Sequence, residues 1–234
     1  MPEIRLDKFI ASQSALSRSQ ARSAIARGRV LVDGQVVRQP DCPVDTESEI
    51  RLDGSMLSYK AYVYFMLNKP AGIVSATRDA AAKTVLDLLP AHCKKLHCSP
   101  VGRLDRDTTG LLLITNDGDF LHRVISPNRQ IEKSYLVTLD AGLPPGLEDV
   151  FAEGIRLADG TQCRPAVLER LGNCRARVVI TEGKYHQIKR MFGTAGLGVT
   201  ALHRERIGGL PLDPALAPGE MKELDFEKAS SVFA

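Results

Sequence analysis

The sequence predicts an α+β protein with a small N-terminal domain and a larger domain built on a mixed, largely antiparallel sheet flanked by helices. Near the N-terminus, two short helical segments precede two β-rich runs joined by Asp33-Gly34, a dipeptide typical of tight hairpins. Beyond residue 61, β-rich runs alternate with helical stretches, yet several lie too close together for every connection to be a crossover helix. A chain of 234 residues is long enough for both domains.

Composition narrows the class of protein. The hydrophobic fraction of 44% and the charged fraction of 25% are near globular averages. No apolar run approaches the roughly 18 residues that span a bilayer, and the first residues lack the apolar core of a signal peptide. The five cysteines are odd in number and scattered, which favours reduced thiols. These features predict a cytoplasmic protein without a membrane partner.

Metal and nucleotide cofactors are not expected. The segment from His92-Cys93 to His97-Cys98 contains potential zinc ligands, but no second pair at familiar spacing completes a tetrahedral set. The chain contains no phosphate-binding GxxxxGK[ST] loop, and its glycines do not follow a dinucleotide-binding order.

The N-terminal segment predicts two helices with a basic surface. The first helix turns Leu6, Phe9 and Ile10 inward, and Ser17 is a plausible cap for the second. Within the first 40 residues, seven Lys or Arg accompany three acids, and no acid lies between residues 8 and 33.

Three arginines form the core of this basic surface. Arg18 and Arg22 are four residues apart and share a helical face, and Arg29 follows the helix. A stripe of guanidinium groups with no carboxylate to neutralise it matches the repeat of negative charges along a phosphate backbone. These arginines are therefore candidate RNA contacts. An ordinary solvated helix face is the alternative.

Both the layout and the residues of this segment resemble the S4 RNA-binding domain. The residues that carry the resemblance are Arg5–Phe9, Ser17-Arg18, Arg22 and Gly28–Gly34. The resemblance implies an RNA-binding domain over residues 1–55. A linker is then expected over 56–61 and a second domain over 62–234.

In the second domain, strands are expected over 62–68, 111–115, 134–139, 166–169 and 175–180, and helices over 120–125, 146–151 and 186–192.

A polar loop from Pro100 to Thr109 precedes an apolar strand, where a sheet can hold a reacting group at its rim. Asp105 and Asp107 can both point into one pocket if the loop is extended, but not if it is helical. Taken alone, this stretch fits turn-capping aspartates as well as catalytic ones.

A second polar cluster, Glu182–Phe192, holds three cations within one turn and helix. A buried carboxylate needs a paired cation, so Lys189 or Arg190 is expected to pair with an aspartate of the earlier loop. Tyr135 stands in an otherwise aliphatic strand and, on its own, would most often belong to the core.

Together these stretches resemble, in order and spacing, the motifs of pseudouridine synthases of the RsuA class. The residues that carry the resemblance are Asn68–Gly72, Gly102–Gly110, Lys133–Tyr135 and Gly183–Lys189. The segments Leu202–Gly209 and Leu216–Glu220 are similar to the branch that modifies small-subunit ribosomal RNA at position 516. With the S4-like start, the resemblance spans nearly the whole chain.

The resemblance implies catalytic roles for three residues. Asp105 matches the essential aspartate, Tyr135 matches the tyrosine that stacks on the target base, and Lys189 matches the cation that pairs with the aspartate.

The resemblance also implies contacts with the substrate. Arg103 matches an arginine that fills the gap left by the extruded base, and Ile188 would line the apolar side of a closed uracil pocket. Asp107, Lys184 and Arg190 are weaker candidates for RNA contact or local structure.

The reaction implied is isomerisation of uridine to pseudouridine, which needs no cofactor. The implied partner is 16S rRNA or the assembling small ribosomal subunit, bound by a monomer. Two alternatives remain: a non-catalytic ribosome-assembly factor with the same fold, and a hydrolase that uses Asp105 and Asp107 as acid and base.

Overall fold

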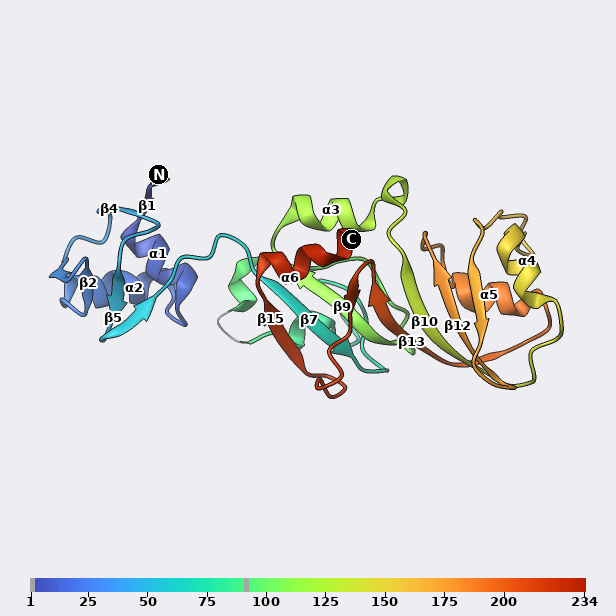
Figure 1. Cartoon of the computed structure of the whole chain (residues 1–234). Helices are drawn as coiled ribbons and strands as arrows, with labels where there is room; N and C mark the ends of the chain where they lie inside the picture. Colours follow the sequence, from blue (N-terminus) through green and yellow to red (C-terminus); the bar gives the residue numbers. More distant parts are fainter. Residues whose placement is uncertain (1–2, 91–92) are drawn as a thin grey trace. The chain divides into compact units, whose positions relative to one another are not determined.

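The computed structural model describes residues 3–90 and 93–234, which group into two compact units (Figure 1). Unit 1 contains Met1–Tyr62 and Leu89–His97, and unit 2 contains Val63–Leu88 and Cys98–Ala234. Leu89–His97 was expected to belong to the second domain. In the structure, Lys95 Nζ of this segment donates hydrogen bonds to the carbonyl oxygens of Ala11, Ser14 and Leu16, two of them at 3.0 Å.

Unit 1 consists of short helices and strands. They are β1 (Glu3–Arg5), α1 (Leu6–Gln13), α2 (Arg18–Ala26), β2 (Val30–Val32), β3 (Gln35–Val36), β4 (Pro43–Asp45), β5 (Ile50–Leu52), β6 (Ser55–Leu57) and the 3-10 helix η2 (Cys93–Leu96). Strands β3-β2-β5-β6 form an antiparallel sheet, and β1 pairs with β4.

The local predictions for this unit are confirmed. Leu6, Phe9 and Ile10 are fully buried, so α1 presents its apolar face to the core. Ser17 and Gln20 form a reciprocal capping box at the start of α2.

Two tight turns close the four-stranded sheet. Asp33-Gly34 joins β2 to β3 with both residues at positive φ (48° and 79°), as a type I′ turn requires. Asp53-Gly54 makes the same turn between β5 and β6 (52° and 82°). The expectation of a linker from residue 56 is therefore wrong at its start, because Met56 pairs with Arg51 across this second hairpin.

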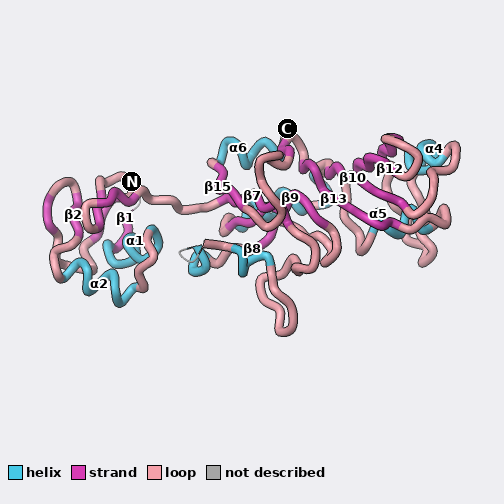
Figure 2. The backbone as a smooth tube through the Cα atoms, turned by 90° about the horizontal axis from the view of Figure 1, so that it is seen from below, coloured by secondary structure: helices cyan, strands magenta, loops and turns pink. Residues whose placement is uncertain are grey.

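Unit 2 holds a nine-stranded sheet and its covering helices, shown by element type in Figure 2. Its strands are β7 (Tyr64–Lys69), β8 (Ser99–Pro100), β9 (Thr109–Thr115), β10 (Lys133–Leu139), β11 (Val167–Arg170), β12 (Arg175–Ile180), β13 (Val199–Ile207), β14 (Leu210–Pro211) and β15 (Met221–Leu224). Its helices are η1 (Val85–Leu88), α3 (Gly118–Ile125), η3 (Pro127–Arg129), α4 (Leu147–Glu153), α5 (Gln187–Gly193), α6 (Phe226–Ser230) and η4 (Ser231–Phe233).

The sheet is mixed and largely antiparallel, which confirms the predicted fold class. Its order is β11-β12-β10-β13-β9-β7-β15, with β14 beside β13 and β8 beside β9. Strands β9 and β13 pair in parallel through only two residue pairs, Thr109 with His203 and Gly110 with Arg204. This short junction joins the two halves of the sheet.

Gly110 makes the junction possible. Its φ of +101° belongs to the region that favours glycine, and a Cβ at this position would lie 2.3 Å from the carbonyl oxygen of Arg204. The two backbones approach too closely for any side chain between them.

Helices α3 and α6 cover one face of the β15-β7-β9 half (Figure 1). Phe120 and Val124 of α3 and Ala229 of α6 pack in one cluster with Tyr64 and Leu111 of the sheet. In the other half, Phe151 of α4 and Phe192 of α5 pack ring against ring at 5.0 Å between centroids. Burial of one large apolar side chain stabilises the folded state by about 1.5–3 kcal/mol. These clusters therefore hold in place the strands that carry the polar loop at the start of β9.

Candidate active site

The loop before β9 holds Asp105 at the rim of the sheet. Leu104 beside it is buried, and both its backbone groups bond to the buried Ser75: Oγ donates to Leu104 O at 2.9 Å and accepts from Leu104 N at 3.1 Å. The N–H of Thr108 donates to Asp105 O at 3.1 Å. The loop is non-helical, which allows Asp105 and Asp107 to reach the same neighbour.

The buried side chain of Lys69 supports this loop from below. It is fully excluded from solvent, and Nζ donates to the carbonyl oxygens of Pro70 at 3.0 Å, Arg106 at 3.3 Å and Thr108 at 2.8 Å. Burial lowers the pKa of Lys69 to about 8, although the negative charges of Asp107 and Asp105 act to raise it. Sequence reasoning placed Lys69 in a motif but assigned it no role.

We expect Lys69→Met to lower the free energy of unfolding by about 2 kcal/mol, because three carbonyl oxygens lose their donor while the desolvation cost of the ammonium is removed. Urea denaturation of both proteins measures the difference. Lys222→Met, which changes a lysine whose side chain is 57% exposed, is the control and should stay within about 0.5 kcal/mol of the parent. Equal stability of Lys69→Met and the control would contradict the supporting role.

Lys189 brings the two aspartates together. Its Nζ lies 3.2 Å from Asp105 Oδ2 and 2.6 Å from Asp107 Oδ1. Burial lowers the pKa of Lys189, but hydrogen bonds to Asp107 and Asp105 outweigh it and raise the pKa above its usual range. The hydrogen bond from Lys189 is also the largest cause of the lowered pKa of Asp107. Of the two cations that the sequence offered, the structure therefore pairs Lys189 with the loop.

The site is more open than the sequence analysis expected. The exposed fractions are 27% for the Asp105 side chain, 23% for Lys189 and 73% for Asp107. The expectation of a closed pocket is wrong for the free protein, because solvent reaches all three side chains. Asp105 is the more sheltered of the two carboxylates, and Asp107 faces solvent.

His186 is a neighbour of Asp105 that sequence reasoning missed. Its Nε2 lies 3.6 Å from Asp105 Oδ1, and its backbone is left-handed (φ 48°) immediately before α5. In the sequence it stands three residues before Lys189, within the helix expected over 186–192, and that spacing would put both side chains on one helical face. That spacing was the available signal.

Tyr135 meets a buried arginine across the sheet. Tyr135 on β10 is 7% exposed and pairs in register with Arg204 on β13, whose Nη1 donates to the tyrosine hydroxyl at 3.4 Å. Arg204 is 2% exposed, and its Nε donates to Leu111 O at 2.8 Å. Its Nη2 has no hydrogen-bond partner among the residues that the structure describes.

Arg204 also acts electrostatically on the lysine that supports the aspartate loop. Its charge is among the causes that lower the pKa of Lys69, the residue beneath that loop. Leu202–Gly209 contributed only to the family resemblance, and neither strand β13 nor Arg204 was predicted to belong to the site.

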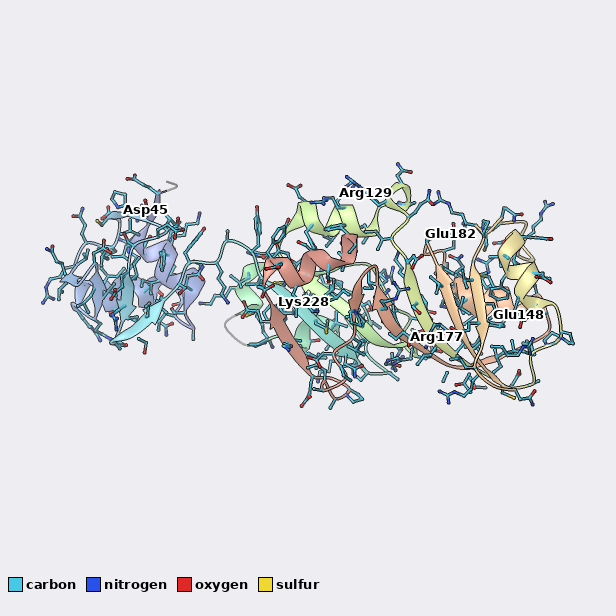
Figure 3. All side chains as sticks on the ribbon, viewed as in Figure 1. Asp45, Arg129, Glu148, Arg177, Glu182 and Lys228 are labelled. Atoms are coloured by element: carbon cyan, nitrogen blue, oxygen red, sulfur yellow. The ribbon has the colours of Figure 1, made fainter. Side chains whose placement is uncertain are left out.

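The predicted substrate contacts of unit 2 fall into different environments. Arg103 is exposed, whereas Ile188 is 3% exposed and mostly packed inside the protein. Lys184 pairs with Glu182, a buried carboxylate labelled in Figure 3. Arg190 pairs with Asp159 at 2.5 Å. Lys184 and Arg190 are thus held by acids of their own unit.

The basic surface of unit 1 has a carboxylate at its centre. Asp7 is fully buried, and its Oδ2 lies 3.0 Å from Arg5, 3.5 Å from Arg18 and 3.4 Å from Arg22. The expectation of arginines with no neutralising carboxylate is therefore wrong, because Asp7 at the start of α1 turns toward α2. Burial raises the pKa of Asp7, but hydrogen bonds and charge from Arg5 and Arg18 outweigh it and lower the pKa.

Three cations around one carboxylate leave a positive array. The side chains of Arg5, Arg18 and Arg22 stay 45%, 58% and 55% exposed, so their outer N–H groups face solvent. Arg29 differs, because it forms a two-bond pair with Asp53 of the second hairpin.

No cluster of three His, Cys, Asp or Glu side chains suited to a metal ion occurs within residues 3–90 and 93–234, and His92 lies outside those ranges. Within the same ranges, none of the helices is long and apolar enough to cross a membrane.

The candidate site thus combines a lysine-paired aspartate on a polar loop at the rim of a mixed sheet with a tyrosine buried in the same sheet. Residues 63–194 match the family model described as RNA pseudouridylate synthase, and residues 4–50 match the S4 domain. The chain belongs to the RNA pseudouridylate synthase family and is an RNA pseudouridine synthase.

Particular relatives are similar over nearly their whole length. The ribosomal small subunit pseudouridine synthase A of Escherichia coli (strain K12) is 46% identical over 232 residues, covering 98% of this chain and 100% of the relative. The protein of the same name from Pseudomonas aeruginosa is 44% identical with the same coverage. A crystal structure of a pseudouridylate synthase matches with a TM-score of 0.70 at 38% identity, covering 98% of this chain and 99% of the other.

Proposed function

We propose that this enzyme converts one uridine of small-subunit (16S) ribosomal RNA, the one equivalent to position 516, to pseudouridine. The similar full-length relatives named as small-subunit synthases support the choice of RNA. The single observation that carries the chemistry is the Asp105 carboxylate, 3.2 Å from the ammonium of Lys189 on the rim loop.

The reaction rearranges one nucleoside without net oxidation or hydrolysis. The N1–C1′ bond breaks, the uracil turns, and a C5–C1′ bond forms; C5 then loses a proton while N1 gains one. Three alternative roles for Asp105 all need its deprotonated carboxylate: attack on the sugar, addition to the base, or removal of the 2′ proton. The ammonium of Lys189, 3.2 Å from Asp105 Oδ2, holds this carboxylate in position.

Other side chains receive the flipped uridine. Base flipping costs a few kcal/mol, which stacking and phosphate contacts offset. Tyr135 stacks on the target base, with Arg204 orienting its hydroxyl. Arg103, which is exposed, fills the place of the extruded base, and Ile188 forms the apolar wall of the base pocket. The part-open site of the free protein closes when RNA covers it.

The arginine array around Asp7 binds the phosphate backbone of the RNA. Its three half-exposed guanidinium groups carry two net positive charges beyond the central carboxylate, and Asp7 holds them in one place. Arg29 of unit 1 and Lys184 and Arg190 of unit 2 are further candidates for phosphate contact, although each is already paired with an acid of its own unit.

Replacing Arg18 and Arg22 together by Ala should weaken RNA binding and flatten its dependence on salt. Each lost phosphate contact removes about 0.7–0.9 from the slope of log K against log salt concentration. Filter binding to a 16S rRNA transcript at several salt concentrations measures the slope. Arg51→Ala, which removes an arginine paired with Glu49, is the control. An unchanged slope in the double variant would show that this surface does not bind phosphates and is an ordinary solvated helix face.

We place the enzyme in the cytoplasm as a monomer, where it acts on 16S rRNA or on the assembling small subunit.

The test of the proposed function is a map of pseudouridines in total rRNA from a strain lacking the gene. We expect one pseudouridine to vanish, at the position equivalent to 516, and to return when the intact gene is restored. Persistence of that pseudouridine, with loss at another RNA position, would overturn the choice of target.

A further inference from the structure

Tyr185 stands out as an exposed aromatic ring at the edge of the site. It is 77% exposed, more than Tyr62 (54%) or Phe226 (56%). Its ring stacks on His186 with 3.9 Å between centroids and 18° between planes. Because His186 Nε2 lies 3.6 Å from Asp105 Oδ1, the stack begins beside the reactive carboxylate and ends in solvent.

The backbone beneath the stack is firmly held. The carbonyl oxygen of Tyr185 accepts a hydrogen bond from Arg190 Nη1 at 3.3 Å, and Arg190 Nη2 lies 2.5 Å from Asp159. Asp159 in turn accepts from the backbone N–H of Thr161 at 3.0 Å. His186 takes its left-handed conformation directly before α5, which fixes the direction of the turn.

The fold does not account for the exposed face of this ring. One face of Tyr185 is covered by the imidazole of His186, and most of the side chain remains in contact with water. Aromatic rings held this way stack on the unpaired bases of single-stranded RNA, whatever the base, because every base has a π-face. Arg103 and Arg106 on the loop that carries Asp105 are exposed cations, which suits this loop to attract the phosphates of the same RNA.

We propose that Tyr185, backed by His186, is a stacking platform for an unpaired base that flanks the target uridine in the substrate RNA. This rests on the proposed function, in which the target uridine itself reacts at Asp105 and stacks on Tyr135. The platform holds the neighbouring nucleotide in place while the target is flipped. Tyr185 is thus a substrate-positioning residue and takes no part in bond breaking.

The test compares Tyr185→Ala and Tyr185→Phe with Phe226→Ala, which removes another exposed aromatic of unit 2. With an unmodified 16S rRNA transcript, we expect Tyr185→Ala to raise the half-saturating concentration about tenfold, with the single-turnover rate at saturation within about threefold of the parent. Tyr185→Phe keeps the ring and should stay within about twofold, as should Phe226→Ala.

A fluorescent base identifies the occupant. With 2-aminopurine on either side of the target uridine, the parent enzyme should quench the fluorescence at one flanking position, and Tyr185→Ala should not. Normal half-saturation and normal quenching in Tyr185→Ala would overturn the platform while the parent still forms pseudouridine. A loss of saturated rate as large as that of an Asp105 variant would assign Tyr185 to the reacting base and also overturn it. Absence of product from the parent enzyme would instead refute the proposed function.

Discussion

Asp105→Asn is expected to stop pseudouridine formation, lowering the single-turnover rate on 16S rRNA by at least about 10³-fold while RNA affinity stays within a few fold. The amide has the shape of the carboxylate but can neither attack a carbon nor accept a proton. Lys189 keeps its second partner, Asp107, so the substitution does not leave its ammonium group without a carboxylate. The measurement is nucleoside analysis after single turnover, with protein purified from a host that lacks its own enzyme.

Asp107→Asn is the matched control for this experiment. It removes the same charge and touches the same ammonium, but its side chain is 73% exposed. We expect the rate of Asp107→Asn to stay within about tenfold of the parent, because the Asp107 side chain only helps to position Lys189. Retained turnover in Asp105→Asn, or equal losses in the two variants, would refute the assignment of Asp105.

Gly110→Ala is expected to lower the free energy of unfolding by about 4 kcal/mol or more. The new Cβ would lie 2.3 Å from Arg204 O at a φ of +101°, and the strain would fall on the two-pair junction between β9 and β13. Urea denaturation of the purified variant measures the loss, and failure to fold in cells is the extreme of the same result.

The control for the junction is Gly118→Ala. Gly118 begins α3, and a Cβ there meets nothing within 4 Å. Alanine in a helix is favoured by up to about 1 kcal/mol over glycine, so this variant should be as stable as the parent or slightly more stable. A Gly110→Ala protein within about 1 kcal/mol of the parent would show that the junction tolerates a side chain.

Local features of the fold were predictable from sequence because their causes are local. The cap at Ser17 and the turn at Asp33-Gly34 depend on residues within a few positions of each other, and both formed as predicted. The same turn chemistry occurs at Asp53-Gly54, but the residues from 56 onward were interpreted as a linker, since only the pairing of β5 with β6 shows that a strand follows this turn.

The central strand β13 was missed for a physical reason. His203, Arg204, Glu205 and Arg206 interrupt the apolar alternation that marks a strand. The structure satisfies these polar groups by contacts from distant elements: Glu205 accepts from Arg177 Nε on β12 at 2.6 Å.

For the site, charge complementarity in the sequence predicted a partner for the aspartate loop, and Lys189 lies there. Lys69, His186 and Arg204 gain their positions from tertiary packing, which periodicity cannot convey. The openness of the site likewise depends on how elements meet rather than on any motif.

We propose that Asp105 rearranges a uridine within an intact RNA chain. Quantitative nucleoside analysis of 16S rRNA, before and after incubation with the purified enzyme, tests it most directly. We predict that each uridine lost is recovered as one pseudouridine and that the strand stays whole. Free uracil released in step with uridine loss would contradict the account and make the protein a hydrolase.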